Sequence, residues 1–392
     1  MVMNAEEIYN LSERLYQNKE YPEALEFINR AIEAGGNPYW CLFLKGKISS
    51  ELGLESLADE SYNAAIATDA SANIGAMFEL AKSKYFRGHY DCSEDLIDRA
   101  IERAESSDQK RWYFGSILLL KSILCFFSGK INHADKFLVD AYDFRRDVNF
   151  EELRSEYLIE ELERNKNTYS ESCFVQYIFS LEEMRRNNIA YVKELSKVPS
   201  HSVVVEIGAM DGIRFDMLHD FILEKKCKAI LVEPVKEMFE LLVENYKGIP
   251  GVVFVNKAIS EERGSRVIRR IPSSAVESGK IPDWALGLSS FSSDGSLKFY
   301  EDMLVEETVD CITFDDLCID NDINEIHVIQ IDTEGHDAII FSQIDLGKWN
   351  PLVVHLEFGN LRIVERIDIY RKFTSYGYSC GFDGADITAI KF

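Results

Sequence analysis

The stretch HSVVVEIGAMDG (201–212) decides the fold of the C-terminal half of the chain. Its first part, VVVEI (203–207), is apolar apart from Glu206, and a loop that contains Gly208 and Gly212 follows directly. Such a run is typical of a strand that is buried on both faces, as in a parallel sheet. Glycines directly after a strand allow the backbone to approach a ligand closely. The stretch therefore predicts an α/β domain with a ligand site at the end of its first strand.

Four more short apolar runs follow this first strand. They are AILVE (229–233), VVFV (252–255), IHVIQI (326–331) and PLVVHLEF (351–358). Helical patterns lie between most of them, at 215–226, 235–246, 338–344 and 361–376. The tail, 376–392, has the pattern of two short strands around a glycine-rich turn. We therefore expect a doubly wound parallel sheet with helices on both faces and an antiparallel edge.

The residues just after each strand are the candidate ligand contacts, because ligands of such sheets bind beyond the carboxyl ends of the strands. Glu206 and Asp211 flank the first loop, Glu233 ends the second strand, and Asn256 follows the third. This outline fits either NAD or S-adenosylmethionine. The dinucleotide fingerprint GxGxxG lacks its middle glycine here, and Asp211 would point a negative charge at a pyrophosphate. Carboxylates instead suit an ammonium and a sulfonium, which favours S-adenosylmethionine.

A set of six motifs resembles the FkbM family of methyltransferases over about residues 200–392. The motifs are VVEIGAMDG (204–212), ILVEP (230–234), NKAIS (256–260), GLSSF (287–291), VDCITFDDLC (309–318) and IQIDTEGHD (329–337). The resemblance implies a class I, Rossmann-like methyltransferase fold with a doubly wound seven-stranded sheet. It also implies S-adenosylmethionine as the cofactor and O-methylation, typically of a sugar or polyketide hydroxyl.

The resemblance also implies roles for single residues. Glu206, Gly208 and Asp211 would face the methionine part of the cofactor, together with Gly212 in the same loop. Glu233 would hold the ribose, and Asn256 would lie near the adenine. Asp332 occupies the last motif and belongs to the expected cofactor and catalytic residues. Taken singly, each position also fits a structural role, as a turn glycine, a helix-capping acid or a turn-forming asparagine.

A hydroxyl acceptor needs a general base, and candidates gather after the fourth and fifth strands. We expect His336 or His355 to act as the base, because a neutral histidine titrates in the useful range. Asp332 and Glu357 would orient the base or bind the acceptor. Either histidine also fits a purely structural position. Asp332, Glu334 and His336 alternate, so Mg²⁺ remains a possible additional cofactor, although the predicted site contains no dedicated metal ligand.

The segment 261–325 is longer than a simple crossover and is expected to contribute a lid. Its runs RVIRRI (266–271) and VEETVDCITF (305–314) are expected to form a hairpin. Between them, Trp284 is a candidate for stacking on a sugar ring. Ser289 and Ser290 are expected near the reaction centre.

The first half of the chain repeats itself with a helical period. The small residues Ala24, Ala58, Ser93 and Ala134 recur at steps of 34, 35 and 41 residues. Each is followed four residues later by a large residue and seven residues later by alanine, which places all three on one helix face. This pattern resembles tetratricopeptide repeats, and it predicts an all-α array of four hairpins over 5–148. Such arrays form concave surfaces, so a protein or substrate partner is expected there, with plain hairpin packing as the alternative.

Composition and charge narrow the partners further. The 392 residues carry 43 Lys and Arg against 67 Asp and Glu, a net charge of −24. This balance argues against nucleic acid as a partner. No secretory signal or membrane span is expected, and eight cysteines without a CxxC pair indicate reduced thiols and a cytoplasmic location.

The sequence as a whole predicts three parts. Helical repeats are expected over 1–150, a helical cap and linker over 151–200, and the methyltransferase domain over 201–392. The expected function is S-adenosylmethionine-dependent O-methylation of a small-molecule or glycan acceptor. A scaffold protein with a degenerate methyltransferase fold and an NAD-dependent oxidoreductase are the alternatives.

Overall fold

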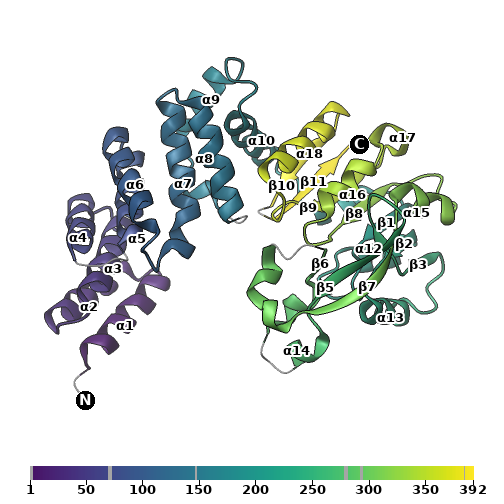
Figure 1. Ribbon diagram of the computed structural model, residues 1–392, viewed down its shortest axis with the longest axis horizontal. Coiled ribbons are helices and arrows are strands. Elements are labelled where there is room, and N and C mark those ends of the chain that lie inside the picture. Colours follow the sequence, from purple (N-terminus) through teal and green to yellow (C-terminus); the bar gives the residue numbers. More distant parts are fainter. Residues whose placement is uncertain (1–2, 69–72, 146–147, 278–280, 292–294, 384) are drawn as a thin grey trace. The chain divides into compact units, whose positions relative to one another are not determined.

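The computed structural model describes residues 3–68, 73–145, 148–277, 281–291, 295–383 and 385–392. The chain divides into two compact units, Met1–Val175 and Gln176–Phe392 (Figure 1). The division falls inside the helix α10 (Cys173–Asn187), within the predicted linker.

The first unit consists of helical hairpins, which confirms the predicted repeat architecture. Neighbouring helices pair as α1 with α2, α3 with α4, α5 with α6 and α7 with α8. Their bounds are α1 (Ala5–Gln17), α2 (Tyr21–Glu33), α3 (Pro38–Glu51), α4 (Glu55–Ala67), α5 (Ile74–Phe86), α6 (Tyr90–Ala104), α7 (Lys110–Phe127) and α8 (Ile131–Phe144). The short helix η1 (Phe150–Glu152) and α9 (Glu156–Asn165) follow.

The repeated small residues lie where the hairpins pack. Ala24, Ala58, Ser93 and Ala134 belong to the second helix of each hairpin, and each is at most 1% exposed. Serine hydroxyls connect the two helices in three of the hairpins: Ser12 donates to the carbonyl of Ala24, Ser93 to that of Ala81, and Ser122 to that of Ala134. A larger side chain at the small positions would separate the helices, which explains why the pattern recurs.

The second unit is built on a seven-stranded sheet of order β10-β11-β9-β8-β1-β2-β3 (Figure 1). The strands are β1 (Val203–Ile207), β2 (Lys228–Val232), β3 (Val252–Val255), β8 (Val328–Ile331), β9 (Val353–Glu357), β10 (Ser379–Phe382) and β11 (Asp386–Ile390). Only β11 runs against the others, since it pairs antiparallel with both β9 and β10. The predicted seven-stranded sheet and its antiparallel edge are confirmed.

Helices cover this sheet and fix its strands in place. They are α11 (Tyr191–Lys197), α12 (Leu218–Lys225), α13 (Lys236–Asn245), α15 (Phe314–Asp320), α16 (Asp337–Gln343), α17 (Leu346–Trp349) and α18 (Ile363–Ser375). One core cluster joins α11, α12 and α13 to β1, β2 and β8 through Leu195, Phe221 and Leu242. The strands β1 and β2 are buried along almost their whole length, as their apolar sequences predict.

The predicted hairpin between β3 and β8 is present and belongs to a second sheet of order β4-β7-β5-β6. Its strands are β4 (Ala258–Ile259), β5 (Gly264–Arg270), β6 (Ser289–Ser290) and β7 (Val305–Ile312), and β5 pairs antiparallel with β7. The short elements α14 (Ser273–Glu277), η2 (Asp283–Gly287) and η3 (Gly295–Met303) lie between β5 and β7 in the chain. This insertion provides one wall of the cavity described next.

Candidate functional site

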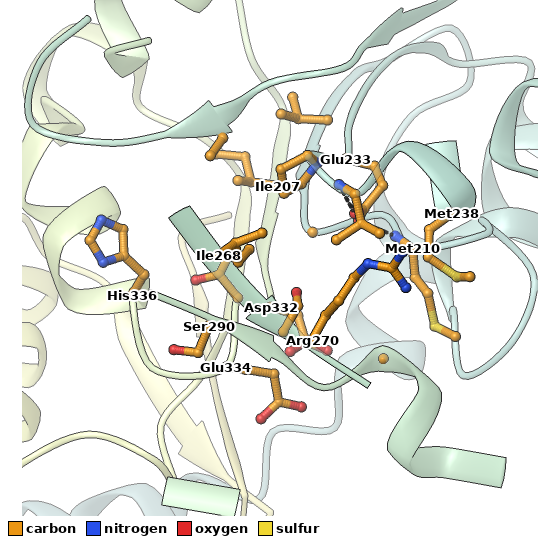
Figure 2. Close-up of a pocket in the computed structure, with 18 of the residues that line it drawn as sticks. Ile207, Met210, Glu233, Met238, Ile268, Arg270, Ser290, Asp332, Glu334 and His336 are labelled. Atoms are coloured by element: carbon orange, nitrogen blue, oxygen red, sulfur yellow. Dashed lines mark hydrogen bonds between the residues drawn. The ribbon is translucent and has the colours of Figure 1, made fainter. Parts of the chain in front are cut away.

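A cavity of about 740 Å³, including its open mouth, lies at the carboxyl ends of β1, β2 and β8. The insertion closes it from the other side with residues of β5, η2 and β6. Figure 2 shows labelled lining residues from both walls, among them Glu233, Asp332 and His336 from the large sheet and Arg270 and Ser290 from the insertion. The cavity therefore occupies the place where open α/β sheets bind ligands.

Gly208 is required at the base of this cavity. Its φ is +91°, a conformation that favours glycine, and a Cβ atom there would lie 1.8 Å from the carbonyl oxygen of Asp332. The backbone N–H groups of Gly208 and Ala209 both donate to the carbonyl of Val232. The loop after β1 thus lies close against the ends of β2 and β8. Only glycine fits at position 208, which leaves the backbone bare at the base of the cavity.

Glu233 is buried at the end of β2 and lines the cavity. Its two carboxylate oxygens accept hydrogen bonds from the backbone N–H of Met210 at 3.0 Å and of Val235 at 2.7 Å. Burial raises its pKa to about 8, and these two hydrogen bonds oppose the shift. The carboxylate is therefore fixed in orientation and retains lone pairs for further donors.

Asn256 supports Glu233 from the end of β3. Its side-chain amide donates to the carbonyls of Glu233 at 2.8 Å and Pro234 at 3.1 Å. Its neighbour Lys257 lines the cavity, whereas Asn256 is outside the lining. The structure thus assigns Asn256 a position that ties the ends of β2 and β3 together.

Three other residues expected at the cofactor lie beside the cavity and do not line it. Glu206 is 1% exposed and accepts a hydrogen bond from Gln330 Nε2 at 3.1 Å. Burial and the neighbouring Asp216 hold the pKa of Glu206 well above its usual range. Asp211 accepts from the backbone N–H of Ile213 and Arg214, so it shapes its own loop.

Gly212 is the third of these residues, and it packs against α13. A Cβ there would lie 2.5 Å from Leu242 Cδ1 and 2.6 Å from Tyr246 Cε2. Gly208 and Gly212, both expected at the cofactor, thus have different roles: Gly208 lines the cavity, whereas Gly212 packs against Leu242 and Tyr246.

His336 and the serine pair lie together at the other end of the cavity. His336 and both Ser289 and Ser290 line it, and the His336 ring contacts that of Phe291 at 5.2 Å. His336 is 8% exposed, and its Nε2 has no hydrogen-bond partner. Burial, followed by the charge of Arg266, lowers its pKa, so the ring is neutral at pH 7. A neutral, unpartnered imidazole nitrogen in a cavity has the properties of a general base.

The two catalytic candidates from β9 lie outside the cavity lining. His355 stacks on Tyr191 of α11 with ring centroids 3.9 Å apart, and its Nδ1 is 2.9 Å from Thr388 Oγ1. Burial lowers its pKa to about 4. Glu357 accepts a hydrogen bond from the side-chain amide of Asn360. The structure therefore separates His355 from His336, which the sequence could not distinguish.

Asp332 and Glu334 follow β8 in the chain, and both line the cavity. The Asp332 residue is exposed to solvent. Glu334 adopts a φ of +54°, which is strained for a non-glycine residue. Burial, then the charges of Asp332 and Asp337, raise its pKa to about 8. Trp284 belongs to η2, but its side chain lies outside the described part of the structure.

Arg270, at the end of β5, also lines the cavity. Its Nε donates to Glu307 Oε2 at 2.7 Å and its Nη1 to Glu237 Oε2 at 3.0 Å. Glu307 also accepts from the backbone N–H of Lys236, at the start of α13. The network joins the insertion to the helix after Glu233. Because Glu237 and Glu307 lie 33 and 37 residues from Arg270, no local pattern signals this network.

The fold and the site together define an α/β domain of the Rossmann-like class with a nucleotide-type cavity. Residues 206–380 match the family described as "Methyltransferase FkbM domain", so this segment is an FkbM methyltransferase domain. Such a domain implies S-adenosylmethionine-dependent methyl transfer. Among curated proteins, none matches the chain.

Three solved structures are similar to part of this chain. The crystal structure of YrrB, described as a TPR protein with an unusual peptide-binding site, is 13% identical, with a TM-score of 0.32; the match covers 45% of this chain and 93% of YrrB. A tetratricopeptide repeat protein from Parabacteroides merdae ATCC 43184 is 16% identical (TM-score 0.30; 45% and 70% covered). MamA is 16% identical (TM-score 0.29; 43% and 99% covered).

No three His, Cys, Asp or Glu side chains in the described ranges are arranged so as to hold a metal ion. No helix within the same ranges is both long and apolar enough to cross a membrane.

Proposed function

We propose that the protein transfers the methyl group of S-adenosylmethionine to a hydroxyl of a sugar, glycan or polyketide-type acceptor. The observation that carries the proposal is the cavity in which Gly208, Glu233 and Asp332 meet at the ends of β1, β2 and β8. A side chain does not fit at Gly208. The Glu233 carboxylate is fixed in orientation and retains lone pairs that can accept further hydrogen bonds. These features fit a ligand with ribose hydroxyls and a positive charge.

Each wall of the cavity has its part in this proposal. Glu233 would accept hydrogen bonds from the ribose hydroxyls, and the apolar side chains of Val235, Met238 and Leu286 would pack against the adenine. The loop from Glu206 to Gly212 would adjoin the methionine part. When bound, S-adenosylmethionine supplies an already activated methyl group.

The protein must then align the acceptor and remove its proton. We assign the base to His336, because its Nε2 is unpartnered and faces no competing donor. Ser289 and Ser290 would help to hold the acceptor beside it, since they line the same end. Asp332 would bind an acceptor hydroxyl. His355 would act indirectly, by supporting the strands that carry the site.

For the helical unit we propose a role in binding a protein or the acceptor. A concave region of about 1050 Å³ within this unit is lined by Trp40, Phe78, Trp112 and Tyr113. Trp112 is 60% exposed and Trp40 43% exposed, so this region presents apolar surface that a partner would cover. All eight cysteines are unpaired, which supports a cytoplasmic location.

Transfer of a labelled methyl group tests the proposal. The full chain is incubated with methyl-labelled S-adenosylmethionine and with fractionated metabolites, glycans and proteins of the source cell. Label in an alkali-stable ether on a metabolite or glycan is the expected result, and a His336→Gln variant should lose it. Label confined to protein amines, or to methyl esters that alkali releases, would contradict O-methylation.

A further inference from the structure

The acids beyond the cofactor end of the cavity form a group of their own. The acid cluster consists of Asp332, Glu334, Asp337, Glu357 and Asp386. The first three follow β8, Glu357 ends β9, and the antiparallel strand β11 places Asp386 opposite Glu357. Their charges act on one another, because burial and then the other four acids hold the pKa of Glu357 well above its usual range.

The acid cluster has almost no compensating positive charge. Among the described residues, its one ionic contact is His355 Nε2, 3.7 Å from Asp386 Oδ2. Burial lowers the pKa of His355 to about 4, so this histidine is neutral at pH 7. The side-chain amide of Asn360, which is uncharged, donates hydrogen bonds to both Glu334 and Glu357. Buried carboxylates are ordinarily paired with a cation, so this arrangement is costly without a ligand.

Three buried polar atoms at this end have no hydrogen-bond partner. They are Asp337 Oδ1, Glu357 Oε2 and His336 Nε2. Asp337 is completely buried, and His336, 8% exposed, lines the cavity with Asp332 and Glu334. An unsatisfied buried acceptor costs about 1–3 kcal/mol, which a ligand donor would recover. Of the three residues, His336 belongs to the cavity lining, so its orphaned Nε2 points to a ligand that donates a hydrogen bond.

Among the described residues, neither cation that lines the cavity, Lys257 or Arg270, forms an ion pair with the acid cluster. Arg270 is neutralised by Glu237 and Glu307. Lys257 follows β3, which is three strands from β8 in the sheet order, or about 14 Å at ordinary strand spacing. Neither side chain balances the acid cluster.

We propose that the methyl acceptor carries a protonated amine, which the acid cluster binds through Glu334 and Glu357 while an acceptor hydroxyl faces His336. This inference rests on the proposed function and names its substrate class, an amino sugar or a similar amine-bearing alcohol. In the reaction, the hydroxyl oxygen forms a bond to the methyl carbon, and the bond from that carbon to sulfur breaks. The hydroxyl proton passes to His336 Nε2, and the amine is bound but not methylated.

Calorimetry with a matched pair of probes tests this proposal. The full chain is saturated with S-adenosylhomocysteine and titrated with the glucosamine disaccharide or with its N-acetylated form, at a pH where the free amine is protonated. We expect the amine to bind at least about tenfold more tightly, as a charge-assisted hydrogen bond provides. Equal binding, tighter binding of the N-acetylated form, or binding of neither would overturn the proposal.

Variants test whether the acid cluster causes the preference for the amine over its N-acetylated form. In the double variant Glu334→Gln and Glu357→Gln, the preference should fall to within about twofold. Asp368→Asn, an exposed acid on α18, should leave the preference unchanged. S-adenosylhomocysteine should bind both variants as it binds the parent. A chain that does not bind S-adenosylhomocysteine contradicts the proposed function, whereas binding without an amine preference contradicts this inference alone.

A second measurement does not depend on the disaccharide scaffold. The metabolite and glycan fractions are N-acetylated chemically before the labelled-methyl assay. Incorporation should fall at least about tenfold relative to untreated fractions, because acetylation removes the charge that the acid cluster binds. Incorporation that survives acetylation would overturn the proposal. A Mg²⁺ titration in the same assay should leave the amine preference intact, and its loss on adding Mg²⁺ would identify the cluster as a metal site instead.

Discussion

Glu233 is the residue on which cofactor affinity should depend most. A Glu233→Ala variant removes the proposed acceptor of the ribose hydroxyls, and also the acceptor for the N–H groups of Met210 and Val235. We expect the Kd for S-adenosylhomocysteine to rise at least about 100-fold, measured by calorimetry. Glu240→Ala, on the exposed face of α13, is the matched control and should bind normally. An unchanged Kd for Glu233→Ala would show that the ribose assignment is wrong.

Gly208 should be far less tolerant than another glycine of similar backbone conformation. Gly208→Ala places a Cβ 1.8 Å from the Asp332 carbonyl, whereas a Cβ at Gly248, with φ +79°, meets nothing within 4 Å. Gly248→Ala should cost only the backbone strain, about 1–2 kcal/mol. Gly208→Ala should cost more than about 4 kcal/mol in urea unfolding. Equal losses for the two variants would contradict the close contact.

His336 should control the rate without affecting cofactor binding. His336→Gln is expected to lower kcat at least about 100-fold, the usual contribution of a general base, with an unchanged Kd for S-adenosylhomocysteine. Because its pKa is lowered, the acid limb of the parent's pH–rate profile should lie below pH 6.5. His133→Gln, an exposed histidine of the helical unit, serves as the control. If His355→Gln loses kcat while His336→Gln keeps it, the assignment of the base is wrong.

At the scale of elements, the buried acids at the strand ends should make the second unit less stable at high pH. The pKa values of Glu233 and Glu334 are raised to about 8, and those of Asp337 and Asp386 to about 7. Between pH 4.5 and 8 the folded chain therefore binds protons that the unfolded chain has released. Stability is greatest below this range and is lost as pH rises through it.

The measurement is the Tm of the ligand-free protein as a function of pH. We expect Tm to fall by roughly 5 °C or more from pH 6 to pH 8.5, since 1 kcal/mol shifts a domain of this size by about 2–4 °C. Glu334→Gln should flatten the slope, because it removes one of the titrating groups. A Tm that rises over this range would contradict the raised pKa values.

The elements themselves could be predicted from the sequence because their signals are local. The apolar runs 203–207 and 252–255 coincide with β1 and β3. The placement of His355 could not be predicted in this way. Its surroundings come from Thr388 on β11 and Tyr191 on α11, which are distant in the chain. The same holds for Arg270, whose partners are on α13 and β7.

Strand ends were the most informative part of the sequence for the site, and they also show where such reasoning fails. Gly208, Glu233 and Asp332 were predicted at the site and line the cavity. Asp211 and Gly212 were predicted by the same argument and instead shape and pack the loop. A strand end fixes the edge of the sheet to which a residue belongs, but the loop's own hydrogen bonds decide which way its side chain points.

At the scale of the whole molecule, the net charge of −24 now has a partial explanation. In the second unit, ten acids lie at or next to the cavity or bind Arg270. They are Glu206, Asp211, Asp216, Glu233, Glu237, Glu307, Asp332, Glu334, Asp337 and Glu357. In the helical unit, acids such as Glu26 and Asp95 lie on exposed helix faces. The charge thus comes from both units, and only part of it concerns ligand binding.

Binding of S-adenosylhomocysteine, compared with binding of NAD, shows whether the cavity accepts a cofactor of the sulfonium type. Both ligands are titrated into the full chain by calorimetry. The cavity predicts a Kd in the micromolar range for S-adenosylhomocysteine and no binding of NAD, because the lining acids Glu233, Asp332 and Glu334 disfavour a pyrophosphate. Binding of NAD without binding of S-adenosylhomocysteine would contradict the account.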